Sequence, residues 1–161
     1  MGANDTITQP LAEFLPYQLS IASNAVSSRI AEQYRVRFGL KVPEWRIMAV
    51  LGDAGPLTQR DLSEATLMDK VAVNRACKVL EDRGLAARSP NKDDGRSHHL
   101  ELTDAGREMH AGIMPLARAM EAEILAGFTA EELAQFRTYL GRVRKSAGEL
   151  DSDSLDDLSP E

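Results

Sequence analysis

The chain has 161 residues, 43% of them hydrophobic, and carries a formal net charge of −6. This length fits one compact domain with helical extensions, and a single cysteine, Cys77, excludes a disulfide framework or a thiolate-rich zinc cluster. No apolar run reaches the ~18 residues of a membrane span, and residues 1–14 lack the layout of a signal peptide. We therefore expect a flexible N-terminus on a cytoplasmic protein without membrane contact.

Two helices are predicted in the N-terminal third of the chain. Apolar residues recur at helical spacing up to Gly39, which supplies a stop, and this pattern predicts a first helix over about 15–38. Pro43 opens a second helix that is expected to close near Gly52.

Two capped helices follow. Thr58, with Asp61 three residues later, has the pattern of a capping box and opens a short third helix. Asp69 is a good N-cap for a fourth helix, which Gly84 ends. Helical spacing gives the fourth helix one apolar face, formed by Val73, Ala76, Cys77 and Leu80.

A hairpin is predicted directly after the fourth helix. The segments 85–88 and 98–102 are short strands around a charged loop, and Leu100 and Leu102 share one face. A helix followed by a basic-tipped hairpin is how a winged helix-turn-helix grips duplex DNA. Residues 41–103 are therefore predicted to be the DNA-binding region.

The charge distribution is compatible with a nucleic-acid partner, although the chain as a whole is acidic. The tail 149–161 carries six acidic residues and no basic ones, so residues 1–148 have no net charge. Between Lys70 and Arg96 there are seven Lys/Arg residues and four Asp/Glu residues, and phosphate neutralisation drives DNA affinity. The acidic tail is expected to be disordered.

Two helices complete the predicted order. Thr103 caps a fifth helix, and Thr129 with Glu132 forms a second capping box for the last one. The apolar stripes of residues 15–40 and 104–148 have no partner in the central module, so we expect them to pair with a second copy in a two-fold dimer. The predicted fold class is mainly α with a small β-hairpin wing: a winged helix-turn-helix with N- and C-terminal dimerisation helices.

The fourth helix and the hairpin loop hold the candidate DNA contacts. Asn74 and Arg75 can bond base edges bidentately, and small apolar side chains can touch thymine methyl groups, while lysines hold phosphates. Arg96 at the loop tip can enter a narrow minor groove, with Asp94 holding the loop backbone or the guanidinium. The predicted DNA-binding residues are Thr58, Lys70, Val71, Ala72, Asn74, Arg75, Lys78, Lys92, Asp94 and Arg96.

Three segments carry a family resemblance: PEWRIMAVL (43–51), PLTQRDLSEATLMDKVAVNRACKVLEDRGL (56–85) and DGRSHHLELTDAGREM (94–109). Through them, residues 15–148 resemble the MarR family of regulators, and the D-x-R…L-T-x-x-G run is the most specific element. The resemblance implies a homodimeric winged-helix regulator, usually a repressor, on a pseudo-palindromic operator in double-stranded DNA. It also implies base reading by Asn74 and Arg75 and a wing centred on Asp94 and Arg96.

The chain departs from the family pattern at two places. Val71 and Ala72 stand where the family usually offers Ser or Thr hydroxyls, so the operator is expected to depend more on apolar contact and shape. The second helix begins with Val42 and Pro43 and lacks the usual Thr cap, which predicts a weaker junction there.

Many proteins of this family are released from DNA by a small, often aromatic ligand, bound between the dimerisation and DNA-binding parts. The candidate effector-binding residues are Tyr17, Trp45, Arg46, Met48 and Met109. An arginine among aromatic side chains suits an anionic aromatic acid or its thioester. The alternative is that these residues belong to the core.

Other functions find less support. A redox sensor would need a reactive thiol, but Cys77 lies on an apolar helix face, and the family's peroxide sensors carry their cysteine near the N-terminus. A metal sensor would draw on His98, His99, His110, Glu101 and Glu108, but adjacent histidines on a strand point to opposite faces. Enzyme motifs are absent, and a winged-helix module that binds protein is a third alternative. No cofactor and no metal site are predicted.

Overall fold

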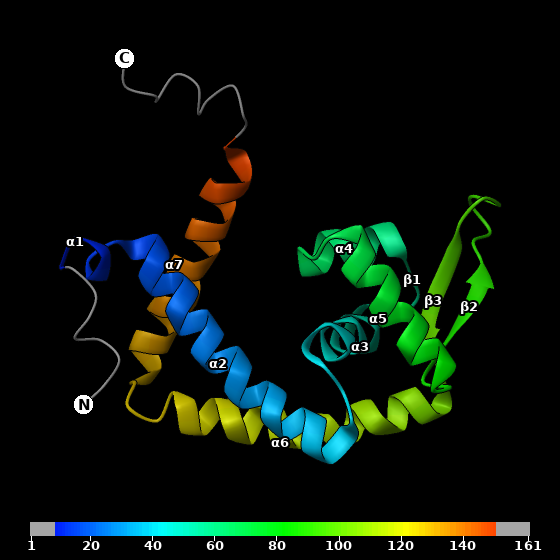
Figure 1. Cartoon of the computed structure of the whole chain (residues 1–161), viewed down its shortest axis with the longest axis horizontal. Helices are drawn as coiled ribbons and strands as arrows, with labels where there is room; N and C mark the ends of the chain where they lie inside the picture. The colour runs from blue at the N-terminus through cyan, green and yellow to red at the C-terminus, as the bar shows by residue number, and fades with distance from the viewer. Residues whose placement is uncertain (1–8, 151–161) are drawn as a thin grey trace. The chain divides into compact units, whose positions relative to one another are not determined.

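The computed structural model describes residues 9–150 and confirms the predicted fold class, mostly helix with one small antiparallel sheet (Figure 1). Residues 1–14 were predicted to be flexible, and of these residues 1–8 lie outside the described part of the chain. Residues 151–161 of the predicted acidic tail (149–161) lie outside it as well. The elements in chain order are α1 Gln9–Ala12, α2 Leu15–Phe38, α3 Val42–Ala54, β1 Leu57–Thr58, α4 Gln59–Thr66, α5 Lys70–Asp82, β2 Ala86–Pro90, β3 His98–Leu102, α6 Asp104–Ile124 and α7 Ala130–Glu149.

Helix α3 begins at Val42 as predicted, but its N-terminal cap and its end differ from the prediction. Glu44 Oε2 accepts the backbone N–H of Lys41 at 2.8 Å, so a glutamate in the first turn satisfies the end that lacks a threonine. The helix continues past Gly52 and ends at Gly55, whose φ of 79° favours glycine. Gly52 instead allows His110 on α6 to lie close to α3, because a Cβ on Gly52 would lie 2.5 Å from His110 Nε2.

The sheet has the strand order β1-β3-β2, with all pairs antiparallel. The predicted hairpin is confirmed, with Ala86 opposite Leu102 and Pro90 opposite His98. Strand β1 was not predicted; it places Thr58 opposite His99 and so attaches the start of α4 to the central strand. Leu100 and Leu102 share the buried face, as their alternation predicted.

The core lies where α3, α4 and α5 meet the sheet (Figure 1). Its fully buried side chains include Leu40, Ile47, Met48, Leu62, Val73, Cys77 and Leu80. Arg83, just after α5, donates from Nη1 to Gly39 O at 3.0 Å and from Nη2 to Phe38 O at 2.9 Å. These bonds tie the end of α5 to the end of α2.

Helix α6 starts against the hairpin. Thr103 Oγ1 accepts the N–H of Gly106 at 3.1 Å, which confirms the predicted cap. Gly106 packs so closely that a Cβ on it would lie 1.9 Å from the carbonyl oxygen of Leu85. The start of α6 is therefore fixed to the base of the hairpin.

The chain divides into two compact units, one ending at Glu121 and the other starting at Ala122. In the second unit, α7 begins with the predicted capping box of Thr129 and Glu132. The rings of Phe128 and Phe136 stack with centroids 6.3 Å apart. None of the helices described within residues 9–150 is long and apolar enough to cross a membrane.

Candidate nucleic-acid interface

Helix α5 has its apolar and polar faces where the sequence predicted them. Its inward side chains are at most 3% exposed and belong to the core: Val73, Ala76, Cys77 and Leu80. Its opposite side presents to solvent Lys70, Val71, Asn74, Arg75 and Lys78. Asp69 Oδ1 accepts the N–H of Ala72 at 2.8 Å, so the helix has a defined first turn behind this exposed face.

Helix α4 is positioned by the capping box that the sequence predicted. Thr58 Oγ1 accepts the N–H of Asp61 at 3.1 Å, and Asp61 Oδ2 accepts from the Thr58 N–H at 3.0 Å and the Thr58 hydroxyl at 2.7 Å. These hydrogen bonds lower the pKa of Asp61, and the nearby His99 adds to the effect. The carboxylate therefore stays ionised and keeps the box closed at neutral pH.

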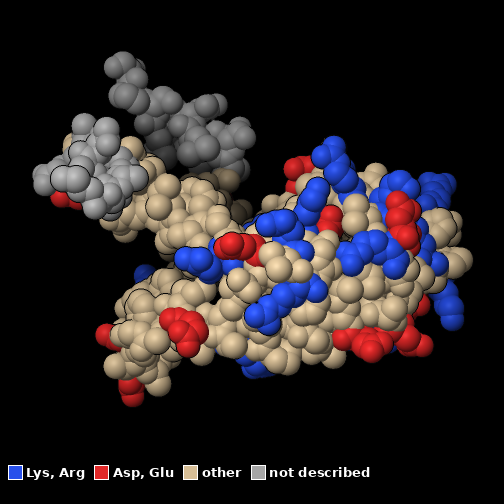
Figure 2. Space-filling view, turned by 60° about the horizontal axis from the view of Figure 1, so that its bottom comes forward, with Lys and Arg blue, Asp and Glu red and all other residues tan. Residues whose placement is uncertain are grey.

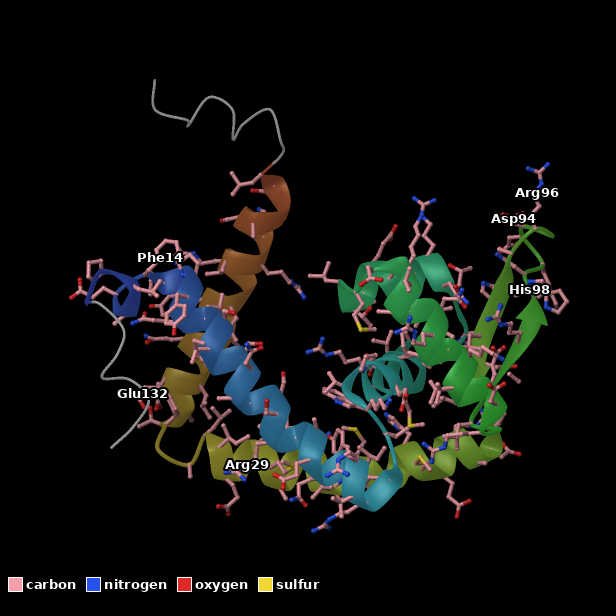
Figure 3. The ribbon with its side chains drawn as sticks, viewed as in Figure 1. Phe14, Arg29, Asp94, Arg96, His98 and Glu132 are labelled. Atoms are coloured by element: carbon pink, nitrogen blue, oxygen red, sulfur yellow. The ribbon has the colours of Figure 1, made fainter. Side chains whose placement is uncertain are left out.

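The hairpin loop is held by its own hydrogen bonds. Asn91 N–H donates to Ser97 O at 3.1 Å, and Asp94 Oδ1 accepts the N–H of Arg96 at 3.0 Å. Asp94 was predicted to hold either the loop backbone or the Arg96 guanidinium, and in the structure it holds the loop backbone. Figure 3 shows Arg96 at the tip of the hairpin, with its guanidinium directed away from the protein.

A hollow of about 480 Å³ lies between the start of α4, the exposed face of α5 and the hairpin. It brings together four residues of the predicted set: Thr58, Asn74, Asp94 and Arg96. His98, for which the sequence suggests packing or phosphate contact at the wing, also lines it, and the sequence did not predict the other polar residues there: Gln59, Arg60, Arg88, Asn91 and Ser97. Among these, Arg88 Nε contacts Glu81 Oε1 at 2.5 Å, an ion pair that joins the hairpin to α5.

The other residues of the predicted set lie outside this hollow. Lys70 lines a neighbouring depression with Arg60 and Asn74, and Arg75 and Lys92 are exposed. Lys78 pairs with Asp82 at 3.3 Å on the surface of α5. A signal for Arg60 was present in the sequence, because Arg60 follows the Thr58 cap of the helix that precedes α5.

Charge on the surface is mixed. On the face drawn in Figure 2, Lys and Arg side chains are interspersed with Asp and Glu and do not form one continuous basic area. Arg60, for example, contacts Glu64 at 3.2 Å, with both side chains well exposed.

The alternative sensor sites receive no geometric support. Cys77 is fully buried, and this burial raises the pKa of its thiol to about 11, so the reactive thiolate is scarce at neutral pH. His98 and His99 lie on β3, while His110 packs against α3 beside Gly52. Residues 9–150 contain no group of three or more His, Cys, Asp or Glu side chains that could hold a metal ion.

A second, smaller hollow of about 170 Å³ lies among α2, α3 and α6. Its lining is largely apolar and consists of Tyr34, Trp45, Met48, Ala49, His110, Ile113, Met114 and Ala117. The rings of Tyr34 and Trp45 meet edge to face with centroids 5.3 Å apart. Burial raises the pKa of the Tyr34 hydroxyl, and Trp45 Nε1 is buried without a hydrogen-bond acceptor among the described residues.

Two of the five predicted effector residues, Trp45 and Met48, line this hollow. Arg46 lies with its guanidinium carbon 6.0 Å from the centroid of the Trp45 ring. Met109 packs against the core, and Tyr17 lies near the start of α2. The structure therefore places Trp45 and Met48 of the predicted set in the lining and leaves Tyr17, Arg46 and Met109 outside it.

Comparison with known proteins gives a consistent result. The model of the MarR family matches residues 38–97. The HTH-type transcriptional repressor Rv2887 of Mycobacterium tuberculosis is 30% identical over 105 residues, which are 65% of this chain and 76% of that protein.

Two solved structures extend the likeness to nearly the whole fold. A MarR/EmrR family transcriptional regulator from Acinetobacter sp. ADP1 has a TM-score of 0.79 and 26% identity, covering 84% of this chain and 96% of that one. The PcaV transcriptional regulator of Streptomyces coelicolor, crystallised in complex with its natural ligand, has a TM-score of 0.69 and 26% identity, covering 91% and 99%.

Proposed function

The chain belongs to the MarR family of DNA-binding transcriptional regulators, and we propose that it acts as a homodimeric repressor of a pseudo-palindromic operator. Members of this family are regulators of transcription and not enzymes. One observation carries the proposal: the exposed face of α5 and the hairpin tip border a single hollow that contains Asn74 and Arg96. In a helix-turn-helix this is the surface that meets DNA, and such a protein works in the cytoplasm.

The residues of this surface have different tasks in DNA binding. Asn74 and Arg75 contact base edges in the major groove, because both are exposed on the first turns of α5. Arg96 enters the adjacent minor groove from the hairpin. Thr58 fixes the start of α4 through its capping box, and Lys70, Lys78 and Lys92 contact phosphates.

The dimer is supported by apolar side chains that each unit leaves exposed. On α2 and just before it, five large apolar side chains are 39–73% exposed: Phe14, Leu15, Leu19, Ile21 and Val26. On α7, four aromatic or aliphatic side chains at helical spacing are 40–51% exposed: Phe136, Tyr139, Leu140 and Val143. Stripes of this kind are typical of surfaces that pair with another chain, and a second copy would cover both.

The second hollow supports an effector site, with a change in the expected ligand. No arginine, lysine or carboxylate lines it; His110 is its one histidine, and the buried Trp45 Nε1 offers a donor without an acceptor among the described residues. A mainly apolar, uncharged aromatic molecule with one acceptor fits these groups better than the anionic acid expected from the sequence. A thermal-shift screen of matched neutral and acidic aromatics would test this, and stabilisation by the acids alone would contradict it.

The salt dependence of DNA binding tests the proposed function. Duplexes enriched by the protein from a random pool should bind with an affinity that falls as salt rises, with a slope of log K against log salt of about −0.9 per phosphate contact. Arg96→Ala should weaken binding to all duplexes and make the slope shallower by about 1. Arg29, which is exposed on α2, provides the matched control Arg29→Ala, and equal losses in both variants would contradict the assignment.

A further inference from the structure

Leu67, in the turn between α4 and α5, combines two unfavourable properties. Its φ and ψ are 54° and 28°, and it is the one non-glycine residue of residues 9–150 with a positive φ. It is also 77% exposed, more than any other large apolar side chain of the described residues. Left-handed backbone is strained for a residue with a Cβ, and exposure of a leucine to water adds a further cost.

The neighbouring residues hold this conformation in place. On one side, the hydroxyl of Thr66 donates to Leu62 O at 2.6 Å. On the other, the hydroxyl of Ser63 donates to Met68 O at 2.7 Å, and Asp69 caps α5. Glycine adopts this conformation without strain, and asparagine tolerates it better than leucine. Folding alone therefore does not account for a leucine at this position.

Leu67 lies just before the start of α5, the helix that carries the proposed base-reading residues. Leu67 and Val71 lie two residues before and two residues after Asp69, at the leading end of α5, and Val71 is 65% exposed. Val71 precedes Asn74 and Arg75 on α5, all three are exposed, and Leu67 lies in the turn that leads into this helix. Two exposed apolar side chains therefore stand at, and just before, the N-terminal end of α5.

We propose that Leu67, together with Val71, recognises thymine through apolar contact with its 5-methyl group in the major groove. Thymine is the base that presents a methyl group there, and neither side chain can form a hydrogen bond to a base. This inference rests on the proposed function, because it requires α5 to enter the major groove. It makes Leu67 a specificity-determining residue whose backbone strain is retained for the contact.

Replacing thymine by deoxyuridine tests the contact directly, because this exchange removes the methyl group and preserves base pairing. In a duplex enriched by the wild-type protein, each thymine is exchanged in turn and affinities are measured by fluorescence anisotropy. We expect at least one thymine in each half-site at which the wild-type protein loses about fourfold in affinity. Leu67→Gly and Leu67→Asn should lose most of the difference between the thymine and deoxyuridine duplexes at that position and keep only the part that Val71 contributes.

Thermal unfolding of the same variants separates recognition from folding. Leu67→Gly should have a melting temperature at least as high as the wild type, because strain is relieved, although it loses most of the thymine discrimination. Asp53 is exposed on α3, outside the proposed DNA contacts and dimer surfaces, and the control Asp53→Ala should keep the wild-type discrimination.

Two results would overturn the inference. If deoxyuridine lowers the affinity of wild type and Leu67→Gly equally, or of neither, Leu67 does not recognise thymine, and the DNA-binding function stands. If the wild-type protein enriches no sequence and binds no duplex, the proposed function fails, and this inference fails with it.

Discussion

Asn74 and Arg75 differ from Arg96 in how the protein supports them. Asn74 and Arg75 project from a helix whose opposite face is fully packed in the core, so their starting points are rigid. Arg96 projects from a loop held by the Asp94 turn and extends beyond the hairpin. A rigid base suits discrimination between bases, and an extended arginine suits contact with a groove of suitable width.

Substitution of the two helix residues should change base preference. We expect Asn74→Ala and Arg75→Ala each to reduce discrimination by about 1–3 kcal/mol at one base position per half-site, with little loss on non-specific DNA. Enrichment of random duplexes by each variant, followed by sequencing, measures this. An unchanged consensus in both variants would show that this part of α5 does not read bases.

Cys77 predicts a pH dependence of stability in the alkaline range. Burial raises the pKa of its thiol from 9.0 to about 11, so between these values the unfolded chain loses the proton first. The free energy of unfolding should be unaffected by this group below pH 9 and should fall between pH 9 and about 11. Urea unfolding at several pH values should give a shallower fall for Cys77→Ala, and identical pH profiles would contradict the assignment. Burial also raises the pKa of Tyr34, so the free energy of unfolding should keep some dependence on pH in both proteins.

At the scale of elements, the start of α6 holds the hairpin in place. Thr103 joins the two through its hydroxyl, which donates to Gly84 O at 2.6 Å and accepts the N–H of Gly106. The ion pair of Arg88 and Glu81 holds the other side of the hairpin against α5. The angle between the hairpin and α5 therefore depends on contacts made by three elements.

Two glycines of α6 should respond in opposite directions to alanine. Gly106→Ala places a Cβ against the Leu85 carbonyl and should destabilise the fold by roughly 3 kcal/mol or more. Gly112→Ala meets only a ring atom of Phe38 at 3.8 Å and should stabilise the helix by up to about 1 kcal/mol. Urea unfolding measures both, and equal effects would contradict the close packing at Gly106.

Elements with local signals were predictable from the sequence, and those that depend on distant partners were not. The capping boxes at Thr58 and Thr129 are local patterns, and both helices begin where they indicate. Strand β1 has two residues, too few for alternation, and exists because β3 lies beside it. In the site, Asn74 followed from helical spacing, whereas Arg88 lines the hollow only because the hairpin folds toward α5.

At the scale of the whole molecule, the central question is how the apolar stripes of the two units are covered. Each unit by itself leaves large apolar side chains exposed, on α2 in one and on α7 in the other. A two-fold dimer would cover them and would also set two copies of α5 at a fixed distance. Dimerisation and the spacing of half-sites are therefore parts of one proposal.

A charge on the apolar stripe of α7 should break the dimer. We expect Leu140→Glu to sediment as a monomer and to lose most of its affinity for a full site. Thr138 lies on the opposite side of α7 by helical spacing, and the control Thr138→Glu should remain a dimer. If both variants sediment like the wild type, α7 is not part of the interface.

The most direct test of the account is a hydroxyl-radical footprint of the wild-type protein on a duplex that it has enriched. We expect two protected half-sites, related by a two-fold axis, with centres about 10–10.5 base pairs apart or a multiple of that distance. Arg96→Ala should reduce protection in the flanking minor grooves and leave the major-groove contacts in register. A single protected segment, or protection that does not follow the sequence, would contradict a dimer that reads DNA with α5 and the hairpin.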